Sequence, residues 1–215
     1  MLEIKSFCFG PFGTNMYVVT GPNSNGGSSS SSKPCLFVDP ACSNSYEEQA
    51  LYRYIEMENL EVKAIIATHG HLDHLWGAHW ACEQWHLPVL IHHSDIRMAE
   101  AMQEQYDLFG VHRQAEPFPI ENLDTQITNI KSQMSDFQVL ETPGHTPGSI
   151  CLYWPQEKVL LSGDTLFRCG YGRTDLPGGD IGFLIDSLGQ LFTLPADVKV
   201  YPGHGDFTTI GAERR

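Results

Sequence analysis

Alternating apolar and polar residues open the chain in two short stretches, 2–9 and 15–20, and a third stretch follows at 35–38. A period of two predicts β-strands that bury one face. The serine-rich run at 24–32 is of low complexity. Because strand-like segments lie on both sides of it, we expect residues 24–34 to form a long hairpin loop.

Three segments repeat apolar residues with helical spacing. The first follows a possible capping box of Ser45 and Glu48, the second covers residues 74–85, and the third begins after Asp180, a suitable N-cap residue. Asp206 is expected to start a last short helix. The three apolar faces are Ala50, Leu51, Tyr54 and Ile55; Leu75, Ala78, Cys82 and Trp85; and Ile181, Leu184, Leu188 and Leu191.

Short apolar, β-branched runs predict further strands. They cover residues 62–67, 89–91, 137–140, 150–154, 158–161 and 198–201. Residues 99–120 are polar and aromatic with two prolines, and their pattern predicts no defined element. Strands followed by helices in both halves indicate an α/β layered fold. No boundary divides the chain, so we expect one domain over residues 1–215.

The amino-acid composition and the net charge limit the kinds of molecule that the protein is expected to bind. Of 215 residues, 41% are hydrophobic and 18% are charged, which is typical of a folded domain with a substantial core. The formal net charge of −13 argues against nucleic acids and anionic membranes, which attract clustered lysine and arginine. We therefore expect a small-molecule substrate, with no nucleic-acid partner and no membrane partner.

The compartment is predicted from three features. The first residues lack a basic start followed by an apolar run, so no signal peptide is expected. No window approaches the ~20 apolar residues that a membrane span needs. Six cysteines occur without a Cys-x-x-Cys pair or regular spacing, which is typical of reduced, mostly buried thiols. These features favour a cytoplasmic protein.

The sequence His69-Gly70-His71-Leu72-Asp73-His74 carries the strongest chemical signal, and it directly follows the strand at 62–67. Imidazole nitrogens and carboxylate oxygens are suitable ligands for Zn²⁺, Fe or Mn²⁺. In an extended loop, His69 and His71 can face one ion while Asp73 and His74 turn toward a second. Gly70 is expected to let the backbone bend tightly around the site.

Three further candidate ligands lie just beyond strand ends. His145, Asp164 and His204 each follow a predicted strand and lie in a glycine-containing turn. Loops at strand ends are where α/β folds assemble functional sites. A lone histidine in a loop is usually solvated, but five of the ten histidines share this setting, so we predict a joint metal site. The other histidines lack it and are not expected to bind metal: His79, His86, His92, His93 and His112.

These motifs together resemble those of the metallo-β-lactamase superfamily. The resemblance rests on residues 69–74, on Thr-Pro-Gly-His-Thr-Pro-Gly at 142–148, on Gly-Asp-Thr-Leu-Phe at 163–167 and on Pro-Gly-His-Gly at 202–205. Two more motifs, Gly-Arg-Thr-Asp-Leu-Pro-Gly-Gly-Asp at 172–180 and Thr-Thr-Ile-Gly at 208–211, resemble the glyoxalase II-like branch, particularly its short single-domain bacterial hydrolases. Together they extend over nearly the whole chain.

The resemblance implies an αββα sandwich with two divalent metal ions at one edge, zinc first and iron or manganese as alternatives. It implies that one ion is bound by His69, His71 and His145, that the other is bound by Asp73, His74 and His204, and that Asp164 bridges both. A bridging hydroxide would be the nucleophile, and Asp73 would help to orient it. The implied activity is thioester cleavage in the manner of hydroxyacylglutathione hydrolase. A thiolate leaving group has a low pKa and needs little help from a general acid.

Arg173 matches a basic position that contacts the substrate carboxylate in glyoxalase II, although a surface charge in a glycine-rich turn is an equal alternative. Cys169 lies nearby and is expected to be a bystander. Glyoxalase II proper also has a C-terminal helical domain that helps to bind glutathione, and we expect none here. Glutathione thioesters should then be cleaved only slowly, since remote binding energy also aligns the reacting carbonyl.

Other functions of this fold remain as alternatives. A persulfide dioxygenase would use one Fe²⁺ held by His69, His145 and Asp164, and the ligand set is compatible with it. A β-lactamase fits poorly, because those enzymes are exported and many have cysteine in place of Asp164. RNA-processing nucleases of the superfamily usually carry an inserted domain and a basic groove, and neither is evident. A non-enzymatic metal-binding role fits least, because a substrate-accessible site keeps open coordination positions.

Overall fold

The computed structural model describes residues 2–21, 32–134 and 136–214. Its first sheet has six strands in the order β1-β2-β3-β4-β5-β6. β1, β2 and β3 are antiparallel neighbours, whereas β3 to β6 are parallel. The bounds are β1 Glu3–Phe9, β2 Thr14–Thr20, β3 Lys33–Val38, β4 Leu60–Ile66, β5 Val89–Ile91 and β6 Ile120–Asn122.

The second sheet has five strands in the order β13-β12-β9-β8-β7. β9 and β12 are parallel, and the other neighbours are antiparallel. The bounds are β7 Gln138–Glu141, β8 Ile150–Trp154, β9 Val159–Gly163, β12 Lys199–Pro202 and β13 Thr208–Thr209. A two-stranded ribbon, β10 Leu166–Phe167 with β11 Gly170–Tyr171, lies beside this sheet.

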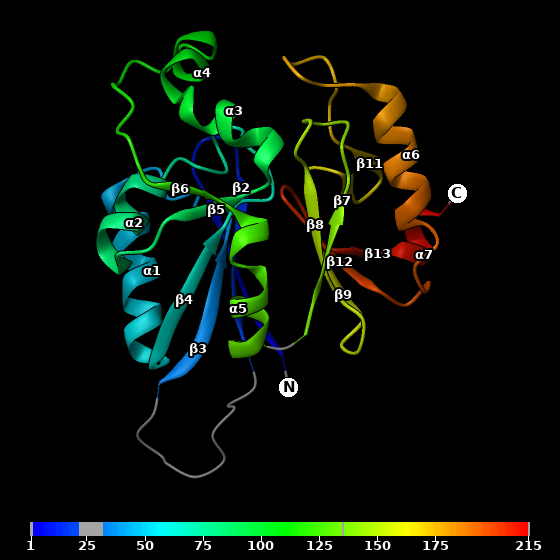
Figure 1. Ribbon diagram of the computed structural model, residues 1–215, viewed down its shortest axis with the longest axis horizontal. Helices are drawn as coiled ribbons and strands as arrows, with labels where there is room; N and C mark the ends of the chain where they lie inside the picture. Colours follow the sequence, from blue (N-terminus) through cyan, green and yellow to red (C-terminus); the bar gives the residue numbers. More distant parts are fainter. Residues whose placement is uncertain (1, 22–31, 135, 215) are drawn as a thin grey trace.

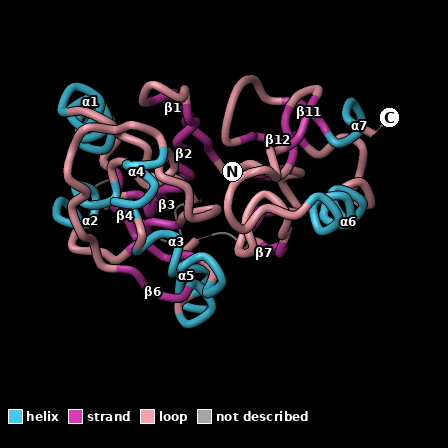
Figure 2. Tube along the Cα trace, turned by 90° about the horizontal axis from the view of Figure 1, so that it is seen from above, coloured by secondary structure: helices cyan, strands magenta, loops and turns pink. Residues whose placement is uncertain are grey.

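Helices cover the outer faces of the two sheets, which gives four layers (Figures 1 and 2). α1 Ser45–Met57 and α2 Ala78–Trp85 cover the first sheet, and α6 Ile181–Leu191 and α7 Ile210–Glu213 cover the second. The short helices α3 Ile96–Glu100 and α4 Met102–Leu108 lie at one end of the first sheet, and α5 Ile127–Gln133 lies along its β6 edge. The αββα sandwich expected from the family resemblance is confirmed.

Successive side chains along a strand point to opposite faces of the sheet, and this alternation explains why the two sheets pack face to face. In β3, Cys35 and Phe37 belong to the core under α1 and α2, whereas Leu36 and Val38 face the second sheet. In β8, Ile150, Leu152 and Trp154 face the first sheet, whereas Cys151 and Tyr153 pack toward α6. Strands buried on both faces have no polar side, which is why they appear in the sequence as short continuous apolar runs.

Several strand predictions agree with the structure. Residues 89–91 and 150–154 are strands with the predicted bounds, and most other strand boundaries differ by one or two residues. The expected loop at 24–34 falls largely on residues 22–31, which lie outside the described part of the chain. Lys33 and Pro34 belong to β3, so the loop ends two residues earlier than expected, and the flanking strands β2 and β3 are antiparallel neighbours as in a hairpin.

Three helix starts were predicted wrongly. Asn44, not Ser45, caps α1, because its Oδ1 accepts hydrogen bonds from the amides of Tyr46 and Glu47. The segment predicted as helix from residue 74 forms turns until α2 begins at Ala78. The last helix does not start at Asp206, since the side chain of Thr209 caps it at Ile210. Residues 99–120, for which the sequence pattern predicts no defined element, contain the end of α3, all of α4 and the first residue of β6.

The described part of the chain contains no helix that is both long enough and apolar enough to cross a membrane. All six cysteines are free thiols, and four of them, Cys35, Cys42, Cys82 and Cys151, are buried. Burial raises the pKa of the Cys82 and Cys151 thiols to about 11, so these thiols are neutral at physiological pH. They therefore act as small apolar core residues.

Candidate metal centre

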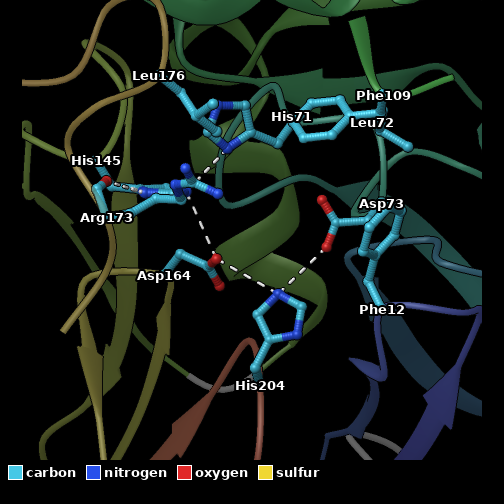
Figure 3. A pocket seen from close by; sticks show the side chains of 10 residues that line it. All are labelled: Phe12, His71, Leu72, Asp73, Phe109, His145, Asp164, Arg173, Leu176 and His204. Carbon is cyan, nitrogen blue, oxygen red and sulfur yellow. Dashed lines mark hydrogen bonds and ion pairs between the residues drawn. The ribbon is translucent and has the colours of Figure 1, made fainter. Parts of the chain in front are cut away.

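The candidate ligands come from four loops that follow strands. The 69–74 loop follows β4, His145 follows β7, Asp164 directly follows β9, and His204 follows β12. The first loop belongs to one sheet and the other three to the second sheet, so the site forms where the two sheets meet at one end of the sandwich. Figure 3 shows five of these side chains converging on one cavity, namely those of His71, Asp73, His145, Asp164 and His204. All seven predicted ligands lie in this cluster.

His69, His71 and His145 form the first group. Each offers a ring nitrogen, and these three nitrogens lie within 4.8 Å of one another. His71 Nδ1 is 2.8 Å from His145 Nε2. All three residues are buried. Three imidazoles this close, with no intervening polar group, have the composition and spacing of a divalent metal site.

Asp73, His74 and His204 form the second group by the same criterion. Asp73 Oδ2 lies 3.2 Å from His204 Nε2 and 3.5 Å from His74 Nε2. Asp164 lies between the two groups. Its Oδ2 is 3.5 Å from His145 Nε2 and 3.4 Å from His204 Nε2, and its Oδ1 is 3.3 Å from His74 Nε2. This carboxylate is therefore within reach of both groups (Figure 3).

Three buried atoms at the centre of the cluster have no hydrogen-bond partner, namely His69 Nε2, His74 Nε2 and Asp164 Oδ1. Leaving a buried polar atom unpaired is costly unless an ion or other partner satisfies it. Nitrogen and carboxylate oxygen donors of this kind suit zinc, iron or manganese. The residues present therefore fit a pair of divalent cations.

The electrostatics of the cluster favour the protonation states that metal ligands need, which are neutral histidine and ionised aspartate. Burial lowers the pKa of His71 to about 3 and also lowers the pKa of His69, so both rings are neutral and keep a lone pair. Burial alone would raise the pKa of Asp164, but the positive charge of His74 and the hydrogen bond from His204 hold it well below its usual range. The pKa of Asp73 is lowered in the same way, against its burial, by His74 and His204.

His74 and His204 respond in the opposite direction. Burial disfavours their charged forms, yet the neighbouring carboxylates raise the pKa of His74 well above its usual value and that of His204 to about 9. Without another cation these rings carry the positive charge that Asp73 and Asp164 require. A metal ion bound there would displace those protons, because ligand histidines must be neutral.

Hydrogen bonds to non-ligand atoms orient the ligands. Asp39 Oδ2 accepts a hydrogen bond from His74 Nδ1 at 2.9 Å, and the backbone oxygen of Arg173 accepts one from His145 Nδ1 at 2.7 Å. Thr14 Oγ1 donates to Asp73 Oδ2 at 2.7 Å. A partner at the distal ring nitrogen leaves Nε2 of His74 and of His145 facing the centre, as is usual for metal-binding histidines.

Two glycines allow the loops to approach closely. A Cβ atom on Gly203 would lie 2.1 Å from Asp164 Oδ1 and 2.7 Å from His74 Cε1, so any side chain there would collide with two ligands. Gly70 was expected to permit a tight bend, but it does not adopt a positive φ. Its lack of a side chain matters because a Cβ there would lie about 3.0 Å from Met98 and 3.1 Å from the Asp95 carbonyl oxygen.

A cavity of about 200 Å³ opens onto the cluster. His71, Asp73, His145, Asp164 and His204 line its inner part. Its other lining residues are Phe12, Leu72, Phe109, Arg173 and Leu176. A small molecule can therefore reach the predicted metal positions from solvent.

A family model described as the metallo-β-lactamase superfamily matches residues 9–204. The chain belongs to this superfamily. Hydroxyacylglutathione hydrolase GloC of Haemophilus influenzae is 36% identical over 189 residues, which are 85% of this chain and 85% of GloC. The probable metallo-hydrolase YqgX of Bacillus subtilis is 33% identical over 183 residues, 84% of each chain. The solved structure of TTHA1623 in a di-iron-bound form has a TM-score of 0.81 at 32% identity, covering 98% of this chain and 97% of that one.

The chain is thus a metallo-β-lactamase superfamily hydrolase whose histidine and aspartate cluster suits divalent metals. The five other histidines belong to none of the metal-compatible groups among the described residues. Cys169 is exposed and does not line the cavity, and its role as a bystander stays a prediction.

Two functional residues of this superfamily hydrolase were not predicted from the sequence. Asp39 orients His74, and its only sequence signal is an acidic residue directly after β3. Asp95 is fully buried and accepts hydrogen bonds from the Gly70 amide at 2.8 Å, the Thr146 hydroxyl at 2.6 Å and the Gly148 amide at 2.6 Å. It joins the loop that carries His69 and His71 to the loop that carries His145, and nothing in its local sequence indicates this.

Proposed function

We propose that this superfamily hydrolase cleaves thioesters at a site that binds two divalent cations. The observation that carries the proposal is the pair of adjoining ligand groups, at whose centre three buried atoms have no hydrogen-bond partner. The cavity in front of them is accessible to a small molecule. The cytoplasmic location and the single-domain organisation expected from the sequence stay predictions.

We assign the ligands as the family resemblance implies. His69, His71 and His145 would hold one ion, and Asp73, His74 and His204 the other, with Asp164 shared between them. Zinc is the first candidate metal. Iron is supported by the di-iron-bound form of TTHA1623, and manganese remains an alternative. When bound, such a pair of ions supplies an activated water and positive charge for a developing oxyanion.

The chain's own residues provide the rest of the chemistry. Asp164 is ionised and would neutralise part of the charge of the two cations. Asp73 is held by Thr14 at Oδ2 and would orient the attacking water. The buried histidines keep their ligand geometry because Asp39 and the Arg173 backbone fix two of the rings. A thiolate can leave without a proton donor, so the lack of an obvious acid fits a thioester.

The choice of a thioester rests on two further points. GloC, a relative over 85% of its length, is named for hydrolysis of hydroxyacylglutathione, which is a thioester. Arg173 lines the cavity, where we propose that it contacts a polar group of the substrate. A glutathione thioester is therefore a substrate to test.

A direct comparison of two reactions tests this function. Purified protein loaded in turn with Zn²⁺, Fe²⁺ and Mn²⁺ is assayed for cleavage of S-D-lactoylglutathione and of a neutral thioester, and for oxygen consumption with glutathione persulfide under air. We expect thioester cleavage and no oxygen consumption. Oxygen consumption with iron, together with no thioester cleavage with any metal, would instead favour a mononuclear iron persulfide dioxygenase that uses His69, His145 and Asp164.

A further inference from the structure

A second, smaller hollow adjoins the metal cavity and shares His71, Phe109 and Leu176 with it. We call this hollow the side groove. Its volume is about 50 Å³, and its remaining lining residues are Met98, Gln105, Leu108 and Pro177. Because the two hollows share three lining residues, the side groove lies directly beside the metal cavity.

The side groove offers almost no polar partner to a ligand. Gln105 is its only amide side chain, and both ends of that amide are already used. Its Nε2 donates to the backbone oxygens of Gly70 and Met98, both at 2.9 Å, and its Oε1 accepts from the Leu72 amide at 2.9 Å. An apolar group beside Gln105 would therefore leave none of the hydrogen bonds of that side chain unmade.

Large apolar side chains are exposed around the opening of both hollows. The exposed fraction is 62% for Leu108, 45% for Phe12 and 38% for Phe109. The rings of Phe12 and Phe109 lie 6.1 Å apart, centroid to centroid. Figure 3 shows both rings on the Asp73 side of the cavity, opposite His145. Exposed apolar side chains grouped beside a reactive centre are typical of a ligand-binding site.

Apart from the proposed cations and the ligand histidines, little in the walls of the two hollows attracts an anion. Among the described residues that line the two hollows, Arg173 is the only lysine or arginine. Its guanidinium is already bound by Asp175 through two hydrogen bonds, Nε to Oδ1 at 2.7 Å and Nη2 to Oδ2 at 2.6 Å. A carboxylate on the substrate must compete with this bidentate pair, which is the strongest arrangement that arginine forms with a carboxylate.

We infer that the preferred substrate is a thioester with a short, uncharged apolar arm, and that this arm lies in the side groove. This inference rests on the proposed thioester hydrolysis and specifies its substrate class. The arm belongs either to the acyl group or to the thiol, and the experiment distinguishes the two. Burying a methylene stabilises a complex by about 0.8 kcal/mol, so each added carbon should raise kcat/KM about fourfold until the groove is filled.

The test uses two series of neutral thioesters with the metal-loaded protein. In one series the acyl chain grows from acetyl to hexanoyl on N-acetylcysteamine. In the other the acyl group stays acetyl and the thiol grows from methyl to pentyl. We expect kcat/KM to rise with length in one series and to exceed the value for S-D-lactoylglutathione.

Matched variants locate the effect. Leu108→Ser should flatten the dependence of kcat/KM on chain length. Ile185→Ser should not, because Ile185 is a similarly exposed aliphatic residue on α6 that lies outside both hollows.

Asp175→Asn should free Arg173 and raise kcat/KM for S-D-lactoylglutathione severalfold without raising kcat/KM for the neutral series. Flat length profiles in both series, with lactoylglutathione cleaved best, would overturn the inference and leave thioester hydrolysis intact. No cleavage of any thioester would instead overturn the proposed function.

Discussion

At the scale of single residues, the site depends on side chains that orient ligands without being candidate ligands. Asp39 holds Thr68 through two hydrogen bonds and His74 through a third. Asp95 does the same for two loops: it contacts Gly70, 25 residues away, in one loop, and Thr146 and Gly148, 51 and 53 residues away, in the other. Such contacts fix the geometry that the ligand sequence alone leaves open.

The difference between predicted and unpredicted residues has a physical cause. The seven candidate ligands were found because histidine and aspartate recur beyond strand ends in glycine-containing turns, which is a local pattern. Asp39 and Asp95 were missed because each acts through residues that are close only after folding. Asp95 lies in a short 3₁₀ turn, where an acidic residue is ordinary.

Replacing Asp95 tests its role. In Asp95→Asn an amide nitrogen takes the place of one oxygen, so at least one of the three donors loses its acceptor. We expect the metal-stripped protein to lose about 2 kcal/mol of unfolding free energy in urea, since buried hydrogen bonds to charged groups are worth that order. Metal affinity, measured by competition with a chelator, should fall as well.

Asp186→Asn, on the exposed face of α6, is the matched control and should change neither quantity. Unchanged stability and unchanged metal affinity in Asp95→Asn would show that Asp95 does not position the ligand loops.

Replacing Asp164 tests the shared carboxylate. An amide carries less negative charge than a carboxylate, so Asp164→Asn should weaken binding of both ions, and thioester hydrolysis should fall by orders of magnitude. Cys169→Ser is the control, because that thiol is exposed and outside the cavity. Metal content and turnover are measured on both variants. An Asp164→Asn protein with two metals and full activity would rule out the shared ligand, and an inactive Cys169→Ser protein would identify a nucleophile that we assigned as a bystander.

At the scale of secondary structure, apolar runs predicted the positions of the strands well. Capping residues and helical spacing predicted the starts of three helices wrongly. Residues 150–154 formed the predicted strand because an uninterrupted apolar run suits a strand buried on both faces. Residues 74–77 have helical spacing but form turns, because His74 is held toward the site by Asp39. Helix propensity is a weak preference, and a buried hydrogen bond in the site outweighs it.

Two glycine-to-alanine changes test how β12 presents His204. In Gly203→Ala the new methyl group would collide with Asp164 and His74, so the turn after β12 must shift and the second ion should bind much more weakly. Gly189→Ala lies in α6 with nothing within 4 Å of the new Cβ and should raise the unfolding free energy by roughly 0.5–1 kcal/mol. Metal stoichiometry and thermal unfolding of both variants check these outcomes. A Gly203→Ala protein that still binds two ions tightly would contradict the assigned geometry.

At the scale of the whole molecule, the sandwich brings together loops that are distant in the sequence. The net charge affects how readily charged substrates approach these loops. The family resemblance predicted the four layers, whereas apolar patterning alone predicted only an α/β arrangement. The order of the strands within each sheet was not predicted, since pairing partners can be far apart in the sequence. For example, β12 pairs directly with β9, although the β10–β11 ribbon and α6 lie between these two strands in the sequence.

The net charge of −13 makes a prediction about ionic strength. An acidic protein repels an anionic thioester, and salt screens this repulsion over roughly 10 Å at 0.1 M. We expect kcat/KM for S-D-lactoylglutathione to rise a few-fold with added salt whose anion binds metals weakly. A neutral thioester measured in parallel should show no such rise. A fall for the anionic substrate alone would mean that local positive charge controls its approach.

Titration of metal into stripped protein tests the two-metal account most directly. Protein treated with a chelator and then dialysed is titrated with Zn²⁺, and separately with Fe²⁺ without oxygen, while thioester cleavage and bound metal are recorded at each step. The account predicts negligible cleavage in the stripped protein, and activity that rises to a plateau at two bound ions per chain. Full activity without metal, or a plateau at one ion per chain that Asp73→Asn and His204→Asn leave unchanged, would contradict it.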